Sequence, residues 1–466
     1  MSENNEFLTD SHCHLDDEKW GGDIEPILLR AKEAGVGRII TVATRQGEEG
    51  ALQTLKICKE HDWIRGVVGI HPHDAKIMTD EILAKLENIA SSPEIVAVGE
   101  TGLDFHYNYS PPEKQEPAFR EMIRMARRLG KPLVIHSRES ATRTLEILDE
   151  EKAWEAGGVM HCFSYDAQVA RYIISKGFYV SFTGVITYPQ AVKTREILAS
   201  LPTEKILIET DAPYLAPVPY RGKRNEPSYV AIVAKAFAEI RKLSERDIMR
   251  ITTTNATRLF RLPMSLNSQV AYVIRNNLYL NITNRCTLSC KFCPKRKDWM
   301  VKGHYLKLVG EPSFERVMEE VQKFDLSSFK EVVFCGFGEP TLRLQFLIEI
   351  AKKLREMSAK SIRLDTDGLA NLVYGRDVTG EIAEVIDEVS VSLNAPDAKT
   401  YNSICPSRYG ESAYEEVKNF ILLSKEKFKR VTATVVGMPD IDVEKCRKIV
   451  QELGVEFRVR EYNEVG

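Results

Sequence analysis

The sequence predicts an α/β protein with two domains, a (β/α)8 TIM barrel followed by a partial, open (β/α)6 barrel. Its 466 residues exceed the length at which a single core normally stops growing. Short apolar runs alternate with stretches of helical periodicity, a pattern typical of parallel strands joined by right-handed crossovers. The alternation pauses after residue 262 and restarts at residue 278. We therefore expect a first domain at residues 1–262, a linker at 263–277 and a second domain at 278–466.

The first domain contains eight runs that we expect to form strands. They lie at residues 7–14, 38–44, 64–71, 95–100, 132–136, 158–161, 178–183 and 205–211. A helix is predicted at residues 112–129, because Pro111 and Pro112 suit its start and Gly130 suits its end. Residues 227–243 and 244–260 are predicted to be closing helices, and Ser244 with Asp247 forms a capping pattern. Eight strand–helix units indicate a closed barrel.

The second domain contains six further runs with the same alternation. They lie at residues 278–283, 331–335, 361–365, 388–393, 430–435 and 456–461. Six strands are too few for an eight-fold barrel, so an open (β/α)6 barrel is predicted. The preceding stretch, residues 261–277, lacks a long periodic pattern and is interpreted as a short linker.

The composition indicates a cytoplasmic protein. Hydrophobic residues make up 43% and charged residues 28% of the chain, and no apolar run approaches the roughly 20 residues that cross a bilayer. The start has neither a basic nor an apolar segment of a signal peptide. Nine cysteines without a disulfide-like pattern fit a reducing compartment. Because the net charge is −3, any nucleic-acid binding must be local or assisted by metal.

Metal-capable side chains follow most of the predicted strands of the first domain. They are His12, His14, Glu100, His136, His161 and Asp211. His12 and His14 are two residues apart, so both can face the barrel mouth from an extended strand. Each residue alone has an ordinary explanation, such as a half-buried histidine or a helix cap. Six capable ligands at the same end of five strands instead indicate a site for one or two divalent ions.

Successive motifs over residues 6–262 resemble the TatD family of metal-dependent hydrolases. They are residues 10–15 (Asp-Ser-His-Cys-His-Leu), 69–73 (Gly-Ile-His-Pro-His), 98–105 (Val-Gly-Glu-Thr-Gly-Leu-Asp-Phe), 134–138 (Val-Ile-His-Ser-Arg), 161–164 (His-Cys-Phe-Ser), 209–215 (Glu-Thr-Asp-Ala-Pro-Tyr-Leu) and 221–227 (Arg-Gly-Lys-Arg-Asn-Glu-Pro). The resemblance implies a metallo-dependent hydrolase barrel, generally a deoxyribonuclease with 3′→5′ exonuclease activity on nucleic-acid ends. It also implies that the six residues above bind Mg, Mn or Zn.

The same resemblance assigns catalytic roles within this set. Glu100 would bridge the ions when two are bound, and His71 resembles the histidine on the substrate side of the family site. Asp211 is placed to act both as a ligand and as a proton acceptor. Arg221, Lys223 and Arg224 could clamp a phosphate, although such a charge run is often only a solvated loop. A deacylase or amidohydrolase that cleaves an aminoacyl ester or a small ester or amide remains an alternative, because it needs the same metals.

Three cysteines open the second domain. Cys286, Cys290 and Cys293 lie in residues 284–294 (Asn-Arg-Cys-Thr-Leu-Ser-Cys-Lys-Phe-Cys-Pro). Three thiolates can hold three irons of a [4Fe–4S] cluster and leave the fourth iron open. The alternative is structural zinc, which needs four ligands, and the nearest further candidate is His304.

The context of these cysteines resembles the radical S-adenosylmethionine (SAM) superfamily. A glycine-rich segment at residues 334–340 (Phe-Cys-Gly-Phe-Gly-Glu-Pro) ends the second predicted strand. The resemblance implies that a [4Fe–4S] cluster reductively cleaves SAM with an electron from a donor such as flavodoxin or ferredoxin. Its SAM contacts would come from the ends of the strands, although ordinary turns are an alternative for the later ones. The candidates are Gly336, Gly338, Glu339, Asp367, Ser392 and Asn394.

The remaining cysteines of the second domain show no further cluster motif. Cys335, Cys405 and Cys446 are scattered and are predicted to be small buried hydrophobic residues. The fusion itself suggests related substrates, and we hypothesise that the protein processes or repairs a modified nucleic acid. The alternative is that the hydrolase acts on a small ester or amide and the radical domain on a peptide or metabolite.

Overall fold

The computed structural model describes residues 7–21, 24–43, 47–107, 109–264, 266–460 and 462. It separates into two compact units, Met1–Ser265 and Leu266–Gly466. The expected strand ends at residues 44 and 461 lie outside the described residues. Among those described, no helix combines the length and the apolar character needed to span a bilayer.

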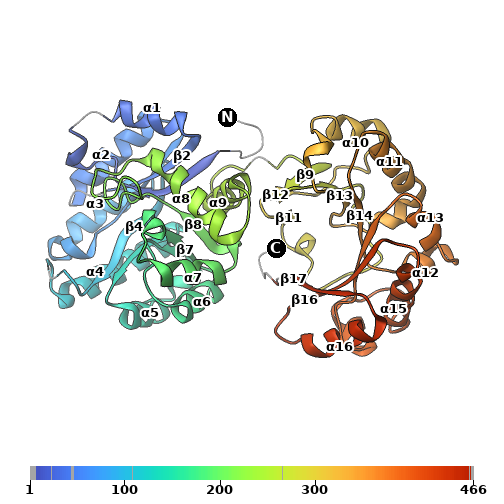
Figure 1. The fold of residues 1–466 in the computed structure, drawn as a ribbon. Helices are drawn as coiled ribbons and strands as arrows, with labels where there is room; N and C mark the ends of the chain where they lie inside the picture. The colour runs from blue at the N-terminus through green and yellow to red at the C-terminus, as the bar shows by residue number, and fades with distance from the viewer. Residues whose placement is uncertain are drawn as a thin grey trace. The chain divides into compact units, whose positions relative to one another are not determined.

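The first unit is the expected (β/α)8 barrel. Its parallel strands follow chain order in one eight-stranded sheet, and helices surround the strands (Figure 1). The strands are β1 (Leu8–Cys13), β2 (Val36–Val42), β3 (Ile64–Val68), β4 (Ile95–Asp104), β5 (Leu133–Arg138), β6 (Gly158–Met160), β7 (Tyr179–Phe182) and β8 (Ile206–Ile208). The helices are α1 (Glu25–Glu33), α2 (Gly47–Glu60), α3 (Asp80–Ala90), α4 (Pro112–Leu129), α5 (Ala141–Glu150), α6 (Ala167–Ser175), α7 (Val192–Ser200), α8 (Val230–Arg241) and α9 (Glu245–Leu259).

Two predicted helix signals in this unit are confirmed. α4 has its expected bounds, and Gly130 ends it in a left-handed conformation with φ of 62°. The Ser244–Asp247 capping box opens α9 with both of its reciprocal hydrogen bonds. The C-terminal end of α9 contributes Leu259 to a buried cluster that also holds residues of seven strands. This apolar cluster fills part of the barrel interior. The polar residues of the site lie at the carboxyl ends of the strands.

The barrel closes between β1 and the segment that follows β8. The Asp211 N–H donates to the carbonyl of His12 at 2.9 Å, and the His14 N–H donates to the carbonyl of Ala212 at 2.8 Å. The buried Asp10 carboxylate adds hydrogen bonds from the backbone and side chain of Thr210, at 2.9 and 2.5 Å. Closure therefore brings the two ends of the eight-stranded sheet together at the predicted metal ligands.

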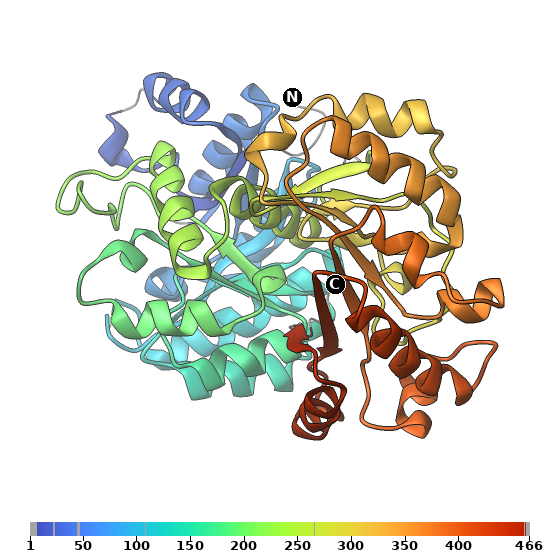
Figure 2. The same ribbon diagram turned by 45° about the vertical axis from the view of Figure 1, so that its right-hand side comes forward.

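The second unit holds the six predicted parallel strands in an open sheet of order β17-β16-β15-β14-β13-β10-β9. The strands are β9 (Ala271–Ile274), β10 (Asn277–Leu280), β13 (Glu331–Phe334), β14 (Ile362–Thr366), β15 (Glu388–Ser392), β16 (Arg430–Val436) and β17 (Glu456–Arg460), and a small hairpin pairs β11 (Met300–Val301) with β12 (His304–Tyr305). The helices are α10 (Phe314–Val321), α11 (Leu344–Glu356), α12 (Ala370–Tyr374), α13 (Thr379–Ala383), α14 (Ala398–Ile404), α15 (Ser412–Lys425) and α16 (Val443–Leu453). Figure 2 shows this unit from a second direction.

The predicted linker is wrong in its second half. β9 lies within residues 263–277 and pairs antiparallel with β10, so it belongs to the second sheet. The strand has only four residues and follows a polar, proline-containing stretch. A search for long periodic patterns therefore does not find it. Residues 275 and 276 form the hairpin turn between the two strands.

Candidate functional site

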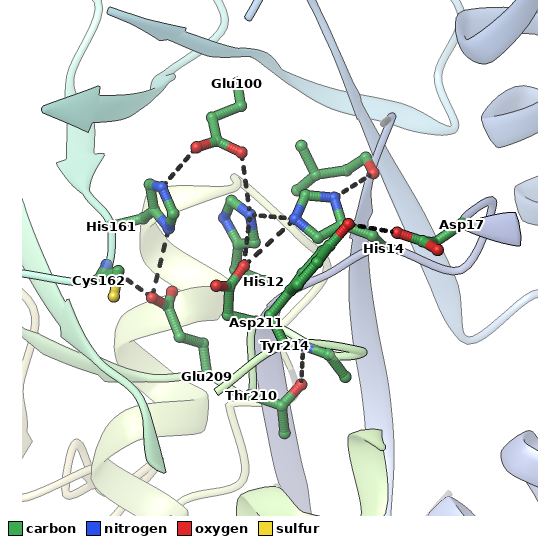
Figure 3. A network of polar contacts seen from close by, with 12 residues as sticks. His12, His14, Asp17, Glu100, His161, Cys162, Glu209, Thr210, Asp211 and Tyr214 are labelled. Carbon is green, nitrogen blue, oxygen red and sulfur yellow. Dashed lines mark hydrogen bonds and ion pairs between the residues drawn. The ribbon is translucent and has the colours of Figure 1, made fainter. Parts of the chain in front are cut away.

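The six predicted metal ligands of the first unit converge at the carboxyl ends of five strands. β1 carries His12, and His14 follows directly, so that their Nε2 atoms lie 3.3 Å apart. β4 and β5 contribute Glu100 and His136 from within the strands, whereas His161 and Asp211 follow β6 and β8. All of these side chains are buried or nearly so. Figure 3 shows His12, His14, Glu100, His161 and Asp211 pointing toward one another.

The Glu100 carboxylate lies between two groups of histidines. Oε1 is 2.6 Å from His161 Nε2 and 2.8 Å from His136 Nδ1. Oε2 faces the other side, 3.4 Å from His12 Nε2 (Figure 3). Burial acts to raise the pKa of Glu100, but the charges of His161 and His71 and hydrogen bonds from histidines outweigh it, so the pKa lies well below its usual value. An ionised carboxylate with one oxygen toward each group suits a bridging ligand.

Asp211 lies opposite Glu100 in this arrangement. Its Oδ1 is 3.3 Å from His14 Nε2 and 3.8 Å from His12 Nε2. The backbone of Asp211 is left-handed, with φ of 57°, which aspartate tolerates better than most residues. The side chain is 14% exposed, against 6% for Glu100, so Asp211 is the more accessible of the two carboxylates.

The donor atoms fit divalent cations. Two groups have their ligand atoms within 4.8 Å of one another, namely His12 with Glu100 and His161, and His12 with His14 and Asp211. Mixed imidazole nitrogens and carboxylate oxygens suit Zn²⁺ or Mn²⁺. Close packing of buried histidine rings, with His12 stacked on His161 at 4.1 Å between centroids, is also expected of a ligand set.

A carboxylate that the sequence reasoning did not assign lies on the far side of His136. Asp104, at the end of β4, has its Oδ2 3.0 Å from His136 Nε2 and 2.8 Å from His73 Nε2. His71 lies on the same side, with Nε2 3.5 Å from Glu100 Oε1. His71, His73 and His136 form a third group that could hold a cation. Asp104 stands in the Gly-Leu-Asp-Phe part of a quoted motif, which was the available signal.

Glu209 was likewise not assigned, and it supports His161. Its Oε1 accepts a hydrogen bond from the Cys162 N–H at 2.7 Å and lies 3.6 Å from His161 Nδ1 (Figure 3). The carboxylate is buried, with 1% of the side chain exposed. A carboxylate behind a metal-binding imidazole fixes its tautomer and orientation. Asp104 is hydrogen-bonded to His136 at 3.0 Å, whereas Glu209 is an ion-pair neighbour of His161 at 3.6 Å.

The three cysteines of the second unit lie in the loop that follows β10. Burial is the main cause that raises the pKa of Cys286 and of Cys293, and the charge of Asp367 contributes for Cys286. The three thiols are half-buried in one short loop, and thiolates with this spacing in the sequence suit an iron–sulfur cluster. The zinc alternative is disfavoured, because both ring nitrogens of His304 contact oxygens of the chain, on Gln269 and Val273.

The glycine-rich segment packs against the start of this loop. A Cβ on Gly336 would lie 2.3 Å from the Asn281 side chain, and one on Gly338 would lie 2.1 Å from the Thr283 carbonyl. The Glu339 N–H donates to the carbonyl of Arg285 at 2.7 Å, directly before Cys286. The glycines are therefore required for close approach of the segment to the cysteine loop.

The carboxylate of Glu339 accepts hydrogen bonds from other residues of the second unit. Oε1 accepts from Thr341 Oγ1 at 2.7 Å and Thr366 Oγ1 at 2.9 Å, while Oε2 accepts from the Asp367 N–H at 2.7 Å. Burial, followed by the charge of Asp367, raises the pKa of Glu339 to about 8. Asp367 in turn accepts from Thr287 in the cysteine loop. Both carboxylates thus join the ends of β13 and β14 to that loop.

Ser392 ends β15 and Asn394 follows it, and β16 separates this strand from the last strand, β17. Arg460 of β17 places Nη2 3.3 Å from Ser392 Oγ and 3.2 Å from Asn394 Oδ1. Asn394 is buried and directs its Nδ2 toward Cys405 Sγ at 3.6 Å. Within the chain, Glu339, Asp367, Ser392 and Asn394 therefore form hydrogen bonds, and Gly336 and Gly338 pack closely against neighbouring residues.

Comparison with known families accounts for both units. Residues 9–261 match the model of the TatD related DNase family, and residues 280–453 match that of the radical SAM superfamily. The first match spans more than half of the chain. The chain belongs to the TatD related DNase family. Its TatD-related barrel is a metal-dependent hydrolase domain, and a radical SAM domain is fused to it.

Individual relatives match the TatD-related barrel. The metal-dependent hydrolase YabD of Bacillus subtilis is 41% identical over 55% of this chain and 100% of its own length. The 3′-5′ ssDNA/RNA exonuclease TatD of Edwardsiella piscicida is 34% identical over 55% of this chain and 100% of its own length. The crystal structure of the TatD homologue YjjV of Escherichia coli is 32% identical, covers 56% of this chain and all of that chain, and has a TM-score of 0.52.

The predicted phosphate-binding residues lie in an exposed loop of the TatD-related barrel. Arg224 lies over the Trp20 ring at 5.2 Å, and the Trp20 Nε1–H donates to the His14 carbonyl at 2.6 Å. Arg221 lies over the Tyr188 ring at 4.5 Å, and Lys223 is exposed between the two arginines. Arg224 is therefore separated from the proposed ligand His14 by one packed indole.

Two exposed tyrosines lie on the other side of the TatD-related site. Tyr107 and Tyr109 are 39% and 61% exposed, and their rings stack at 5.6 Å between centroids with an interplanar angle of 9°. Both rings meet the edge of His73, at 5.7 and 4.9 Å. Arg138 lies over Tyr107 at 4.6 Å. Sequence reasoning missed this aromatic pair, because single exposed tyrosines carry no pattern.

Proposed function

We propose that the TatD-related barrel is a phosphodiesterase that removes nucleotides from the 3′ ends of single-stranded nucleic acid. The observation that carries the proposal is the Glu100 carboxylate, which faces two separate groups of donors. His12, His14 and Asp211 would hold one ion, and His136 and His161 the other. Divalent ions, when bound, supply Lewis-acid charge that makes water more acidic and offsets the charge of a phosphodiester. Mn²⁺, Mg²⁺ or Zn²⁺ would serve.

The residues around this centre take distinct roles in the proposal. Asp211 accepts the proton of the attacking water, because its carboxylate is more accessible than that of Glu100. His71 faces the substrate, since 23% of its side chain is exposed above Glu100. Arg221, Lys223 and Arg224 attract the phosphate backbone.

The rim of the site favours a nucleic acid over a small ester. Tyr107 and Tyr109 offer exposed aromatic faces on which bases can stack, and stacking tolerates any sequence. The exposed loop with Arg221, Lys223 and Arg224 offers positive charge on an otherwise slightly acidic protein. A small ester would need neither feature. The Edwardsiella relative named above, an exonuclease of single-stranded DNA and RNA, supports the same choice.

The test is the variant Asp211→Asn, which we expect to abolish metal-dependent release of nucleotides while the fold is kept. Asp166→Asn is the matched control, because residue 166 caps α6 and asparagine caps equally well. Wild-type-like cleavage by Asp211→Asn, in protein freed of contaminating nuclease, would contradict the proposal. Release of an amino acid from aminoacyl-tRNA, without release of nucleotides, would instead establish the deacylase alternative.

We propose further that Cys286, Cys290 and Cys293 hold a [4Fe–4S] cluster, and that the radical SAM domain reductively cleaves S-adenosylmethionine. The backbone near Gly336 and Gly338 and the end of β15 would contact SAM, and flavodoxin or ferredoxin would supply the electron. Anaerobic protein with SAM and reductant should yield 5′-deoxyadenosine, and Cys290→Ala should not. Cys446→Ala is the control, because this buried cysteine lies in α16, in a separate apolar cluster. Bound zinc without iron would contradict the proposal.

The two activities would serve one pathway of nucleic-acid processing or repair, since covalent linkage raises the local concentration of each product. Addition of single-stranded DNA or RNA should then increase 5′-deoxyadenosine formation and leave the nucleic acid modified. If neither domain binds or alters nucleic acid, the joint role and the phosphodiesterase proposal are both wrong, whereas the proposed cleavage of SAM stands on its own test.

A further inference from the structure

Cys405 lies directly opposite the proposed cluster ligand Cys290. The Ser289 N–H donates to the Pro406 carbonyl and the Lys291 N–H donates to the Ile404 carbonyl, both at 2.9 Å. An antiparallel bridge pairs Leu288 with Ser407 in the same register. Counting inward from that bridge, residue 290 faces residue 405. The two cysteines therefore come from segments more than a hundred residues apart and are cross-strand neighbours.

The register also fixes how the two side chains lie. Hydrogen bonds flank the Cys290–Cys405 pair on both sides, so it occupies a non-hydrogen-bonded position of the ladder. At this position side chains approach most closely and lie on the same face. Pro406 has no N–H, so the hydrogen bond that residue 406 would return to residue 289 is missing. Opposed residues at such a position have their Cβ atoms about 4.5–5.5 Å apart, which brings the two side chains together.

A chain of polar groups orients the Cys405 thiol. Arg460 can only donate, so the Asn394 amide must turn its oxygen toward Arg460, where Nη2 lies 3.2 Å from Oδ1. The amide nitrogen then faces Cys405 Sγ at 3.6 Å and donates to it. Because the Cys405 sulfur accepts from Asn394, its own hydrogen is left for the Cys290 sulfur. Cys405 is fully buried at the C-terminal end of α14.

We propose that Cys405 is a positioning residue for the iron–sulfur site, whose thiol donates a hydrogen bond to the Cys290 sulfur and is held by Asn394 and Arg460. The inference rests on the proposed function of the radical SAM domain. A hydrogen bond to a ligand sulfur stabilises the more negative, reduced form of a cluster, so it raises the reduction potential. Cys405 would thus make the cluster easier to reduce by its electron donor.

The experiment compares anaerobically reconstituted full-length wild type, Cys405→Ala, Cys405→Ser and Cys446→Ala. Iron content and the midpoint potential of the cluster are measured, the latter by redox titration with electron paramagnetic resonance (EPR). We expect equal iron in all four proteins and a more negative potential in Cys405→Ala. Serine keeps a donor, so Cys405→Ser should lie closer to wild type, and Cys446→Ala should match it.

Two outcomes would overturn the inference while leaving the proposed function intact. One is a Cys405→Ala potential equal to that of wild type. The other is loss of iron in both Cys405 variants, which would make Cys405 an iron ligand or a structural residue. A wild type that binds no cluster would overturn the proposed function and, with it, this role.

A second measurement tests the juxtaposition without any cluster. Cluster-free full-length protein is treated with diamide, which takes two electrons and two protons from two thiols and is reduced to the hydrazine as the S–S bond forms. Peptide mapping by mass spectrometry should find Cys290 joined to Cys405, because cross-strand cysteines in this position meet the geometric demands of a disulfide. If Cys290 joins only Cys286 or Cys293, the placement of Cys405 is wrong.

Discussion

Replacing Asp104 with asparagine should weaken metal binding without touching a proposed ligand. The Asp104 carboxylate oxygen Oδ2 lies 3.0 Å from His136 Nε2 and 2.8 Å from His73 Nε2, and 1% of the side chain is exposed. As a carboxylate it accepts the Nε2 hydrogen of His136, so Nδ1, 2.8 Å from Glu100, is the nitrogen that would give up its proton when a cation binds. In Asp104→Asn an amide NH2 can take that position, and the His136 proton then moves to Nδ1. A protonated nitrogen cannot bind a cation.

Loss of such a supporting group typically costs about 10- to 100-fold in metal affinity. Binding of Mn²⁺ should be followed by EPR of the free ion, because Mn²⁺ prefers oxygen and nitrogen ligands and leaves the cysteines of the second domain alone. Glu139→Gln is the matched control, since Glu139 forms an exposed pair with His106 Nδ1 at 2.6 Å that touches no proposed ligand. The reasoning is refuted if Asp104→Asn binds Mn²⁺ as tightly as Glu139→Gln and wild type do.

Two further substitutions test the barrel and its rim. Gly102→Ala would put a Cβ 1.9 Å from the His136 carbonyl oxygen at φ of 141°, so the free energy of unfolding should fall by at least about 1–3 kcal/mol in denaturant titrations. Gly157→Ala also has positive φ but meets nothing within 4 Å, and an equal loss there would contradict the contact argument. Tyr109→Ala should weaken binding of a single-stranded oligonucleotide by about 1–3 kcal/mol, measured by fluorescence anisotropy without divalent ions. Removal of another exposed apolar side chain, in Leu52→Ala, should leave affinity unchanged, because Leu52 lies in α2 and outside the site; a similar loss in both would exclude a specific stacking platform.

Local signals predicted the elements of the fold well where residues with backbone constraints mark their ends. The helix α4 has the predicted bounds, because prolines favour its first turn and Gly130 adopts the left-handed conformation that ends it. β8 is shorter than predicted and stops at Ile208, because Asp211 has a left-handed backbone that cannot continue a strand. β4 is longer than predicted and continues through Gly102 to Asp104, because a glycine there permits contact with the β5 backbone.

The proposed ligands were predictable and their supporting residues were not. His12 and His14 share a face by the two-residue period of a strand. Glu100 and His136 end their predicted runs, although they lie within β4 and β5, and His161 and Asp211 follow β6 and β8. Asp104 contacts His136 and Glu209 lies 3.6 Å from His161, each from a distant part of the sequence, and no spacing in the sequence encodes such a pair. The strand β9 was missed for a related reason, because its stability comes from pairing with β10.

In both domains, as we propose them, one residue binds the metal and a second residue supports the binding residue. A short motif presents the ligand atom, and a residue from a distant segment sets its chemical state. In the TatD-related barrel the proposed ligand is an imidazole, whose free N–H needs an acceptor, so the supports we propose are the carboxylates Asp104, at 3.0 Å from His136, and Glu209, at 3.6 Å from His161. In the radical SAM domain the ligand is a thiolate, which needs a donor, so the support we propose is the thiol of Cys405. The ligands of the motif therefore determine which metal is bound. The supporting residue from a distant segment affects the affinity for the metal or the reduction potential of the cluster.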